Sequence, residues 1–285
     1  MALIPPFYFN CVVALGKRSP NQKISWIGTG TLVGRQYRPG ENGENRYHIF
    51  LVTNRHVLEN QNSLVVRFNP LTSSLAKDFD IPLYGKSGTA LWKSHPDKDQ
   101  DVAVLGMDAD FLNQEAVSYS FFQSNNHLMR IDEMGQRGVS EGDFVYVLGF
   151  PMGIVAEDRQ YVIARSGIIA RLRDTLEKHS KDFLIDAMVF PGNSGGPVIY
   201  KPEIISIEGT KSVTTPSLIG IVSGYLTFKE TALSEQTGLP RIVFEENSGL
   251  ATVVPVDDIM KTIEICFATM NIRETGQRPG KLVLR

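Results

Sequence analysis

Short apolar runs separated by turn-forming residues dominate the pattern of hydrophobic and polar positions along the chain. Each run is about as long as a strand, is rich in Val, Ile, Phe and Tyr, and is bounded by Gly, Pro, Asn or Asp. The runs cover residues 7–15, 26–33, 47–53, 64–68, 102–105, 144–149, 161–169, 183–187, 197–200, 218–222 and 250–255. Helical patterns are scarce between them, so the crossover helices of a parallel sheet are missing. The pattern therefore predicts an antiparallel all-β protein.

One segment near the C-terminal end of the sequence has helical spacing. Apolar residues after Pro255 recur at intervals of three and four, and two acidic residues stand where the first turn would be. The apolar positions are Val256, Ile259, Met260, Ile263, Cys266, Phe267 and Met270, and the acidic ones are Asp257 and Asp258. We expect a helix here, followed by a frayed or loosely docked tail at residues 273–285.

The number of strands indicates two compact units. About ten strands in about 250 residues suit two small barrels better than one large one. The polar, glycine-rich residues 123–142 form the predicted linker. We therefore place an N-terminal barrel at residues 7–122, a C-terminal barrel at residues 143–256, and the helix and tail at residues 257–285.

Composition narrows the classes of partner. Lys and Arg number 29 against 31 Asp and Glu, and this near-balance argues against a protein whose main task is to bind nucleic acid. No run approaches the roughly 18 apolar residues that span a bilayer, so we expect no membrane association. The N-terminal residues show no secretory signal, and only two cysteines, Cys11 and Cys266, occur. Both lie in apolar runs and are expected to be buried thiols, which favours a cytoplasmic, reducing location.

The most informative run is Gly192-Asn193-Ser194-Gly195-Gly196, which precedes an apolar strand. Glycines around one serine permit a backbone with positive φ and leave space around the hydroxyl, as attack on a carbonyl requires. A tight glycine turn also lets two backbone N–H groups converge on an oxyanion, here those of Gly192 and Ser194. A plain glycine turn between strands has the same pattern, so a catalytic serine needs a base and an acid elsewhere in the chain.

Of the five histidines, His56 is the best candidate for the base. It follows a strong apolar strand at the point where the chain turns, and a strand end holds a side chain firmly while leaving it open to substrate. His48 alternates within a strand, which is more typical of a structural residue. The remaining three, His95, His127 and His179, stand in polar loops.

The candidate acid is Asp101, which opens the apolar run that follows it and would therefore be buried beside an imidazole. Order along the chain then separates two architectures. The pattern G-x-S-x-G also occurs in the nucleophile elbow of α/β-hydrolases, in which the histidine follows the serine. Every histidine here precedes Ser194, which excludes that fold. The order His56, Asp101, Ser194 is the one found in two-barrel chymotrypsin-like peptidases.

Five segments resemble the chymotrypsin-fold serine peptidases and, within them, the trypsin-like branch of the bacterial HtrA (Deg) proteases. They are residues 53–57, 101–105, 147–169, 185–197 and 249–255. The resemblance implies two six-stranded antiparallel Greek-key β-barrels with a C-terminal helix. It also implies that Ser194 is the nucleophile, that His56 acts as general base and then acid, and that Asp101 fixes the imidazole tautomer. An acyl-enzyme would form and then be hydrolysed.

The same resemblance implies residues that bind substrate around the S1 pocket. A strand would pair with the substrate backbone by β-augmentation. That strand consists of Ile221, Val222, Ser223 and Gly224. Met188 and Val189 would lie near the base of the pocket, with Ile221 on a wall. None of these residues is acidic, so a preference for Arg or Lys lacks its counter-charge, and we expect a medium-sized apolar residue at P1.

Departures from the family limit what the resemblance implies. HtrA proteins usually carry a PDZ domain, which the residues after the helix are too few to form, so the resemblance does not imply the oligomeric or chaperone-like behaviour of HtrA. Asn193 stands where many secreted relatives have Asp, and this removes the partner of the amine that processing creates. Control would then come from elsewhere, for example from the ordering of loops, and a regulatory protein partner is a further expectation. The long segments 207–217 and 228–249 are interpreted as a specificity or regulatory lid, or else as structural decoration.

The sequence thus predicts an intracellular serine endopeptidase with a polypeptide substrate, no cofactor and no metal. A second hypothesis is a catalytically silent pseudo-protease that holds peptides in the same groove, although the retained triad residues argue against it. A phosphate- or metal-binding protein is a weaker third hypothesis. The glycine run lacks the Lys-Ser/Thr ending of a P-loop, and no His, Cys or Asp cluster has metal-ligand spacing.

Overall fold

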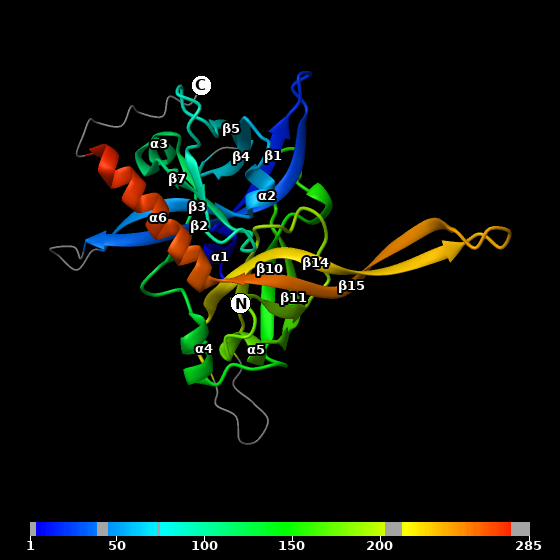
Figure 1. Ribbon diagram of the computed structural model, residues 1–285. Coiled ribbons are helices and arrows are strands. Elements are labelled where there is room, and N and C mark those ends of the chain that lie inside the picture. Colours follow the sequence, from blue (N-terminus) through cyan, green and yellow to red (C-terminus); the bar gives the residue numbers. More distant parts are fainter. Residues whose placement is uncertain (1–3, 39–44, 73–74, 203–212, 275–285) are drawn as a thin grey trace.

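Two β-sheet bodies make up most of the protein (Figure 1). The computed structural model describes residues 4–38, 45–72, 75–202 and 213–274. Strands β1 to β9 form the first body and strands β10 to β15 form the second. The predicted all-β class with a C-terminal helix is therefore confirmed.

The first body is a curled sheet with the strand order β5-β4-β1-β2-β3-β7-β6, to which β8 adds on β4 and β9 adds on β2. Its strands are β1 (Val12–Arg18), β2 (Ile24–Arg38), β3 (Arg46–Thr53), β4 (Ser63–Pro70), β5 (Lys77–Pro82), β6 (Trp92–Ser94), β7 (Ala103–Met107), β8 (Val117–Ser118) and β9 (Phe122–Gln123). The resemblance implied a closed barrel of six strands here, whereas this body is a curled sheet of nine strands, of which six have five residues or more. The segment that connects β5 to β6 folds back on itself, and in it the Leu91 amide donates to the Leu83 carbonyl over 2.9 Å.

The second body is a closed antiparallel barrel of six strands in the order β10-β11-β12-β15-β14-β13. Its strands are β10 (Phe144–Gly149), β11 (Ile163–Arg171), β12 (Phe183–Asp186), β13 (Pro197–Tyr200), β14 (Ser217–Leu233) and β15 (Pro240–Pro255). This matches the six-stranded barrel that the resemblance implied. Closure leaves the barrel itself without an exposed sheet edge.

Each body has its own apolar core, and a third cluster of buried side chains lies between them. Phe50 and Val104 of the first body meet Leu148 and Ile221 of the second in this middle cluster. Each large side chain buried in this way contributes about 1.5–3 kcal/mol to folding. The interface is therefore part of the hydrophobic core, and it fixes the position of one body against the other.

The predicted C-terminal helix is confirmed as α6 (Val256–Glu274), which begins directly after β15. It packs against β6 and β7 of the first body and against β14 and β15 of the second. Its apolar residues, including Ile259 and Ile263, belong to the cluster between the bodies. The two cysteines are not joined in a disulfide and are buried in the same cluster, as their apolar surroundings predicted. No helix in the described part of the chain is both long and apolar enough to cross a bilayer.

The remaining helices are short. They are α1 (Pro6–Asn10), α2 (Arg55–Leu58), α3 (Ala109–Gln114), α4 (Ile131–Arg137), α5 (Arg173–Leu176) and a 3₁₀ turn at Pro151–Gly153. Helix α1 corrects the prediction of one strand over residues 7–15, because Pro6 at the first helical position starts a helical turn before β1 begins. Helix α4 lies inside the segment that was predicted as a linker.

Strands β14 and β15 continue beyond the barrel as a two-stranded ribbon that projects far from both bodies (Figure 1, yellow to orange). We call residues 227–247 the arm. Its two strands pair from Thr227↔Asn247 outwards, and the Ser234 amide donates to the Leu239 carbonyl at the tip over 2.9 Å. The segment predicted as a lid at residues 228–249 thus projects away from the bodies. Residues 207–212 of the other predicted lid, and 275–285 of the predicted tail, lie outside the described residues.

Candidate active site

The structure brings His56 and Asp101 into direct contact. His56 Nδ1 lies 2.5 Å from Asp101 Oδ2, and the His56 backbone N–H donates to Asp101 Oδ1 over 3.1 Å. The imidazole is half exposed, whereas 21% of the Asp101 side chain is exposed. One carboxylate therefore fixes both the ring and the backbone of the histidine, which leaves Nε2 on the open side.

Strand register explains why these two residues meet. Strands β3 and β7 pair side by side as far as Thr53↔Ala103. His56 follows Thr53 by three residues and lies in the first turn of α2, while Asp101 precedes Ala103 by two. The two side chains consequently leave the same end of neighbouring strands.

Several donors hold the Asp101 carboxylate in its ionised form. Burial by itself would raise the pKa of Asp101, but hydrogen bonds from His56 and the nearby charges of His56 and Arg55 outweigh it, so the pKa lies below its ordinary value of 3.8. The Ser223 hydroxyl also donates to Oδ2 over 3.4 Å, and the Asn54 side-chain amide donates to the Asp101 backbone carbonyl over 2.6 Å. The carboxylate is therefore ready to hold an imidazolium.

A tight turn over residues 190–193 shapes the loop that carries Ser194. The Asn193 amide donates to the Phe190 carbonyl over 3.0 Å, and Gly192 at the third position has φ 99°, a conformation that favours glycine. The buried Asn193 side chain accepts a second hydrogen bond, from the Phe190 amide over 3.0 Å. Asn193 therefore closes the turn with neutral hydrogen bonds. Because Asn carries no charge, it cannot form the ion pair with a chain-end amine that an Asp at this position could form.

Two backbone N–H groups at the serine loop, those of Gly192 and Ser194, have no acceptor in the described part of the chain. The Pro191 carbonyl accepts from the Met152 amide over 2.6 Å, and the Asn193 carbonyl accepts from the Gly196 amide over 2.8 Å. Because C=O and N–H point to opposite sides of a trans peptide, the N–H groups of Gly192 and Ser194 face away from these partners. Neither donates a hydrogen bond to another group in the described part of the chain. They are the two amides that the sequence singled out for an oxyanion.

The first body holds the serine loop through two threonines of β2 that sequence reasoning missed. The Thr29 hydroxyl donates to the Gly192 carbonyl over 2.6 Å and accepts from the Phe150 amide over 3.1 Å. The Thr31 hydroxyl donates to the Gly195 carbonyl over 2.8 Å. Both threonines are fully buried. The loop of the second body is thus aligned on the body that carries His56.

Replacing Thr29 with Val should weaken this alignment. The variant keeps the shape of the side chain but leaves the Gly192 carbonyl and the Phe150 amide without a partner, at about 1–3 kcal/mol for each buried group. We expect a lower free energy of unfolding by urea denaturation and a lower rate of any Ser194-dependent reaction. Thr31→Val, which breaks one hydrogen bond, is the control and should cost less. Wild-type stability in Thr29→Val would contradict this role.

Ser194 and His56 line one hollow of about 340 Å³ between the bodies. The hollow is also lined by Val189, Phe190, Pro191, Val222, Ser223, Gly224 and Tyr225. The Ser194 hydroxyl donates to the Ser223 carbonyl over 3.4 Å, and no hydrogen bond joins it to His56 among the described residues. The nucleophile, base and acid candidates are therefore in one place, with the hydroxyl turned toward β14.

Two predicted substrate-binding residues lie outside this lining. Side chains alternate along extended backbone, so the placement of Val189 and Val222 at the hollow turns their neighbours elsewhere. Met188 is 49% exposed, and Ile221 is buried in the cluster between the bodies. Phe190 and Tyr225, which the sequence analysis did not select, line the hollow instead.

The carboxyl group of Asp182 is partly buried and interacts electrostatically with Asp101. Burial, reinforced by the negative charges of Asp258 and Asp101, raises the pKa of Asp182 to about 6. Burial likewise raises the pKa of Asp258, although His95 at 3.3 Å opposes the shift. These residues contact neither the hollow nor Ser194, so their effect is on stability.

Stability should therefore fall as the pH rises from about 4 to 6. The folded state holds the Asp182 proton up to about pH 6, whereas the unfolded chain releases it near 3.8, so the folded state binds more protons in this window and loses stability as pH rises. We expect a loss of about 1–2 kcal/mol, reduced from the full shift because the carboxyl is partly exposed. Asp182→Asn should remove this part of the pH dependence of urea unfolding. An unchanged pH profile in that variant would disprove the assignment.

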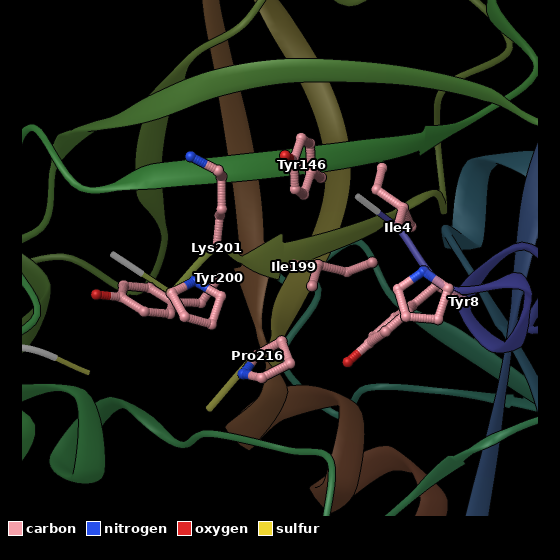
Figure 2. Close-up of a pocket in the computed structure, with 9 residues that line it drawn as sticks. Ile4, Tyr8, Tyr146, Ile199, Tyr200, Lys201 and Pro216 are labelled. Carbon is pink, nitrogen blue, oxygen red and sulfur yellow. The ribbon is translucent and has the colours of Figure 1, made fainter. Parts of the chain in front are cut away.

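A second hollow, of about 350 Å³, lies on the outer side of the barrel (Figure 2). Figure 2 shows Ile4 and Tyr8 on one side of it, Tyr200 and Lys201 on the other, and Ile199 between them. Its lining is mostly apolar, and the described lining residues include no His, Ser, Cys, Asp or Glu, in contrast to the hollow that contains Ser194.

Comparison with known proteins identifies the family of the chain. A family model described as a trypsin-like peptidase domain matches residues 28–202. Among solved structures, the chain is similar to the crystal structure of the MamO protease domain from Magnetospirillum magneticum in its apo form. The TM-score is 0.46 and the sequence identity 15%, over 90% of this chain and 96% of that chain. The comparison with curated proteins gives no match. Since the family model spans more than half of the sequence, the chain belongs to the trypsin-like peptidase domain family.

Proposed function

We propose that this protein is a serine endopeptidase that hydrolyses peptide bonds through Ser194, His56 and Asp101. The observation that carries the proposal is that His56, held by Asp101, and Ser194 line one hollow. The loop around Ser194 also offers the amides of Gly192 and Ser194, which donate to no other group in the described part of the chain. The order of these residues in the chain and the family membership support the same reaction.

Each group has a distinct task in the proposed reaction. A substrate carbonyl enters the hollow, the Ser194 hydroxyl rotates from the Ser223 carbonyl toward His56, and Ser194 Oγ attacks the carbonyl carbon while His56 Nε2 takes its proton. The amides of Gly192 and Ser194 stabilise the negative oxygen. His56 then gives the proton to the leaving amine, which produces an acyl-enzyme. Water, deprotonated by His56, releases the acid and restores the serine.

Proposed specificity follows from the lining of the hollow. Its side chains beside Ser194 are Val189, Val222, Phe190 and Tyr225, and no carboxylate stands among the described lining residues. We expect medium-sized apolar P1 residues to be preferred, as measured by mass spectrometry on an unbiased peptide library. Ser194→Ala is the control. Cleavage confined to peptides with Arg or Lys at P1 would refute this preference.

Covalent labelling tests the function directly. A fluorophosphonate probe should label wild-type protein at Ser194, and the label should be absent in Ser194→Ala and strongly reduced in His56→Ala, because the base activates the nucleophile. Mass spectrometry of the labelled peptide identifies the site. Labelling of wild type and Ser194→Ala to the same extent would show that the reactive group is another residue.

One observation favours a second candidate function, a pseudo-protease that binds peptides without cleaving them. The Ser194 hydroxyl is turned to Ser223 and away from His56. If the protein is a pseudo-protease, the fluorophosphonate probe should not label Ser194 even in the presence of a polypeptide partner. If the protein is a latent peptidase, labelling of Ser194 should increase when the partner binds. We also propose an intracellular location, which the two buried cysteines support because they are not joined in a disulfide.

A further inference from the structure

One edge of β14 has no partner strand where the arm leaves the barrel. On that edge, pairing with β13 ends at Pro197↔Ile221, while pairing with β15 on the opposite edge continues to Leu233. Between Ser223 and Leu233, no other strand in the described part of the chain pairs with the edge. At a rise of about 3.3 Å per residue, this open edge runs for about 35 Å.

The open edge starts at the reactive serine. Its first residue, Ser223, has its carbonyl 3.4 Å from the Ser194 hydroxyl, and Gly224 and Tyr225 line the same hollow. β14 runs outwards from this point toward the tip of the arm. A strand that pairs with it antiparallel runs inwards and ends at Ser194, so its N-terminal part lies on the arm.

The two faces of the arm differ in character. Residues that share one face, by the pairs Phe228↔Glu246, Glu230↔Phe244 and Ala232↔Ile242, are apolar apart from two carboxylates. The opposite face is largely polar and carries the ion pair of Lys229 with Glu245 at 2.6 Å. We call the first of these the apolar face. Phe228 and Phe244 are 54% and 53% exposed on it, and no other described residues form a second layer over them.

These features describe an incomplete sheet. A two-stranded hairpin is marginally stable in water, and a third strand with a hydrophobic face is what makes such a sheet stable. We infer that the third strand is the substrate itself, that is, the segment preceding the scissile bond, bound antiparallel along the open edge of β14 from Ser223 to Leu233. This inference rests on the proposed function, since it continues the site at Ser194 outwards.

The inference specifies a class of substrate. The bound segment has to be extended and unpaired, as in an unfolded chain or a long tail, because its own backbone must supply the hydrogen bonds. Side chains that fall on the apolar face beside Phe228 should be apolar. A basic side chain is favoured beside Glu230, which shares that face. By strand register, these positions lie about five and seven residues upstream of P1.

Paired fluorogenic peptides test the inference. Both have the same residues at the scissile bond, but one begins about four residues upstream of it and the other about ten. We expect kcat/KM of the wild-type protein to be at least about tenfold higher for the long peptide. N-methylation of alternate backbone amides in the extension should remove this gain, because the hydrogen bonds to the edge are lost.

Three variants locate the effect. In the first, Asn-Gly replaces residues 228–246 and keeps the Thr227↔Asn247 pair. It should cleave the short peptide at the wild-type rate and give a long-to-short ratio near one. Phe244→Ser should lower the ratio, whereas Val243→Ser, equally exposed on the polar face, should not. A wild-type ratio near one, or a high ratio in the trimmed variant, overturns the inference.

Binding separates this inference from the proposed catalysis. In a Ser194→Ala background, fluorescence anisotropy should show at least about tenfold tighter binding of the long peptide than of the short one, and the trimmed arm should abolish the difference. A protein that binds but never cleaves would retain the arm site and lose the proposed function. If the arm instead mediates a dimer, sedimentation velocity will show a dimer for the wild-type protein and a monomer for the trimmed variant. The cleavage and binding measurements will then show no effect of peptide length, and this result refutes the inference.

Discussion

Replacing Ser194 with Ala should abolish peptide hydrolysis, with kcat lowered by on the order of 10⁶-fold, the size of loss known for a triad serine. Alanine removes the hydroxyl that attacks the carbonyl, and none of the other residues lining the hollow can replace it from the same position, since Ser223 has its hydroxyl on Asp101. Turnover of a fluorogenic peptide with an apolar P1 residue measures the effect.

Two further variants decide whether the serine acts within a triad. His56→Ala should cause a loss of similar size, and Ser194→Ala with His56→Ala should be no slower than either single variant, because groups that act as one unit are not additive. Circular dichroism and urea unfolding check that each variant is folded. A loss of less than roughly tenfold in either single variant would count against the assignment.

Replacing Gly192 with Ala should have the second-largest effect, a fall in kcat of about 10²–10³-fold. Gly192 has φ 99°, and an added Cβ would collide with the Phe150 carbonyl. To relieve the collision the peptide has to rotate, which takes the Gly192 N–H away from the oxyanion. KM should change little, because the amide acts on charge that develops in the transition state.

A matched glycine provides the control. Gly238 at the tip of the arm also has positive φ, at 68°, but has open space around it, so Gly238→Ala introduces backbone strain without touching the site. It should leave kcat for a short peptide at the wild-type value. Affinity for a peptide aldehyde, which mimics the tetrahedral intermediate, should fall in Gly192→Ala only. Equal kcat in wild type and Gly192→Ala would exclude this amide as an oxyanion donor.

Much of the site could be identified from the sequence because its signals are local. The glycine run around Ser194, the strand before His56 and the apolar run after Asp101 each occupy adjacent positions, and their order along the chain eliminates the α/β-hydrolase fold. The role of Thr29 could not be read in the same way. Its hydroxyl bonds to a carbonyl 163 positions away, and that contact exists only once the two bodies dock.

Other errors had a signal in the sequence. Residues 227–233 and 240–247 contain β-branched and aromatic residues and flank a short polar segment with Gly238, which is consistent with a hairpin. The period of two along a strand also separates Val222, at the hollow, from Ile221, in the core. By contrast, the sequence has no strong apolar run at the two-residue strands β8 and β9, because they complete a sheet whose other strands define it.

The neutral turn at Asn193 has a consequence for how such an enzyme would be restrained. A catalytic loop closed by amide–carbonyl bonds takes its working shape during folding and needs no newly cut chain end to complete it. Activation by a second protease would then be unnecessary. The activity would instead be controlled by which unfolded chains reach the hollow at Ser194, and when they reach it.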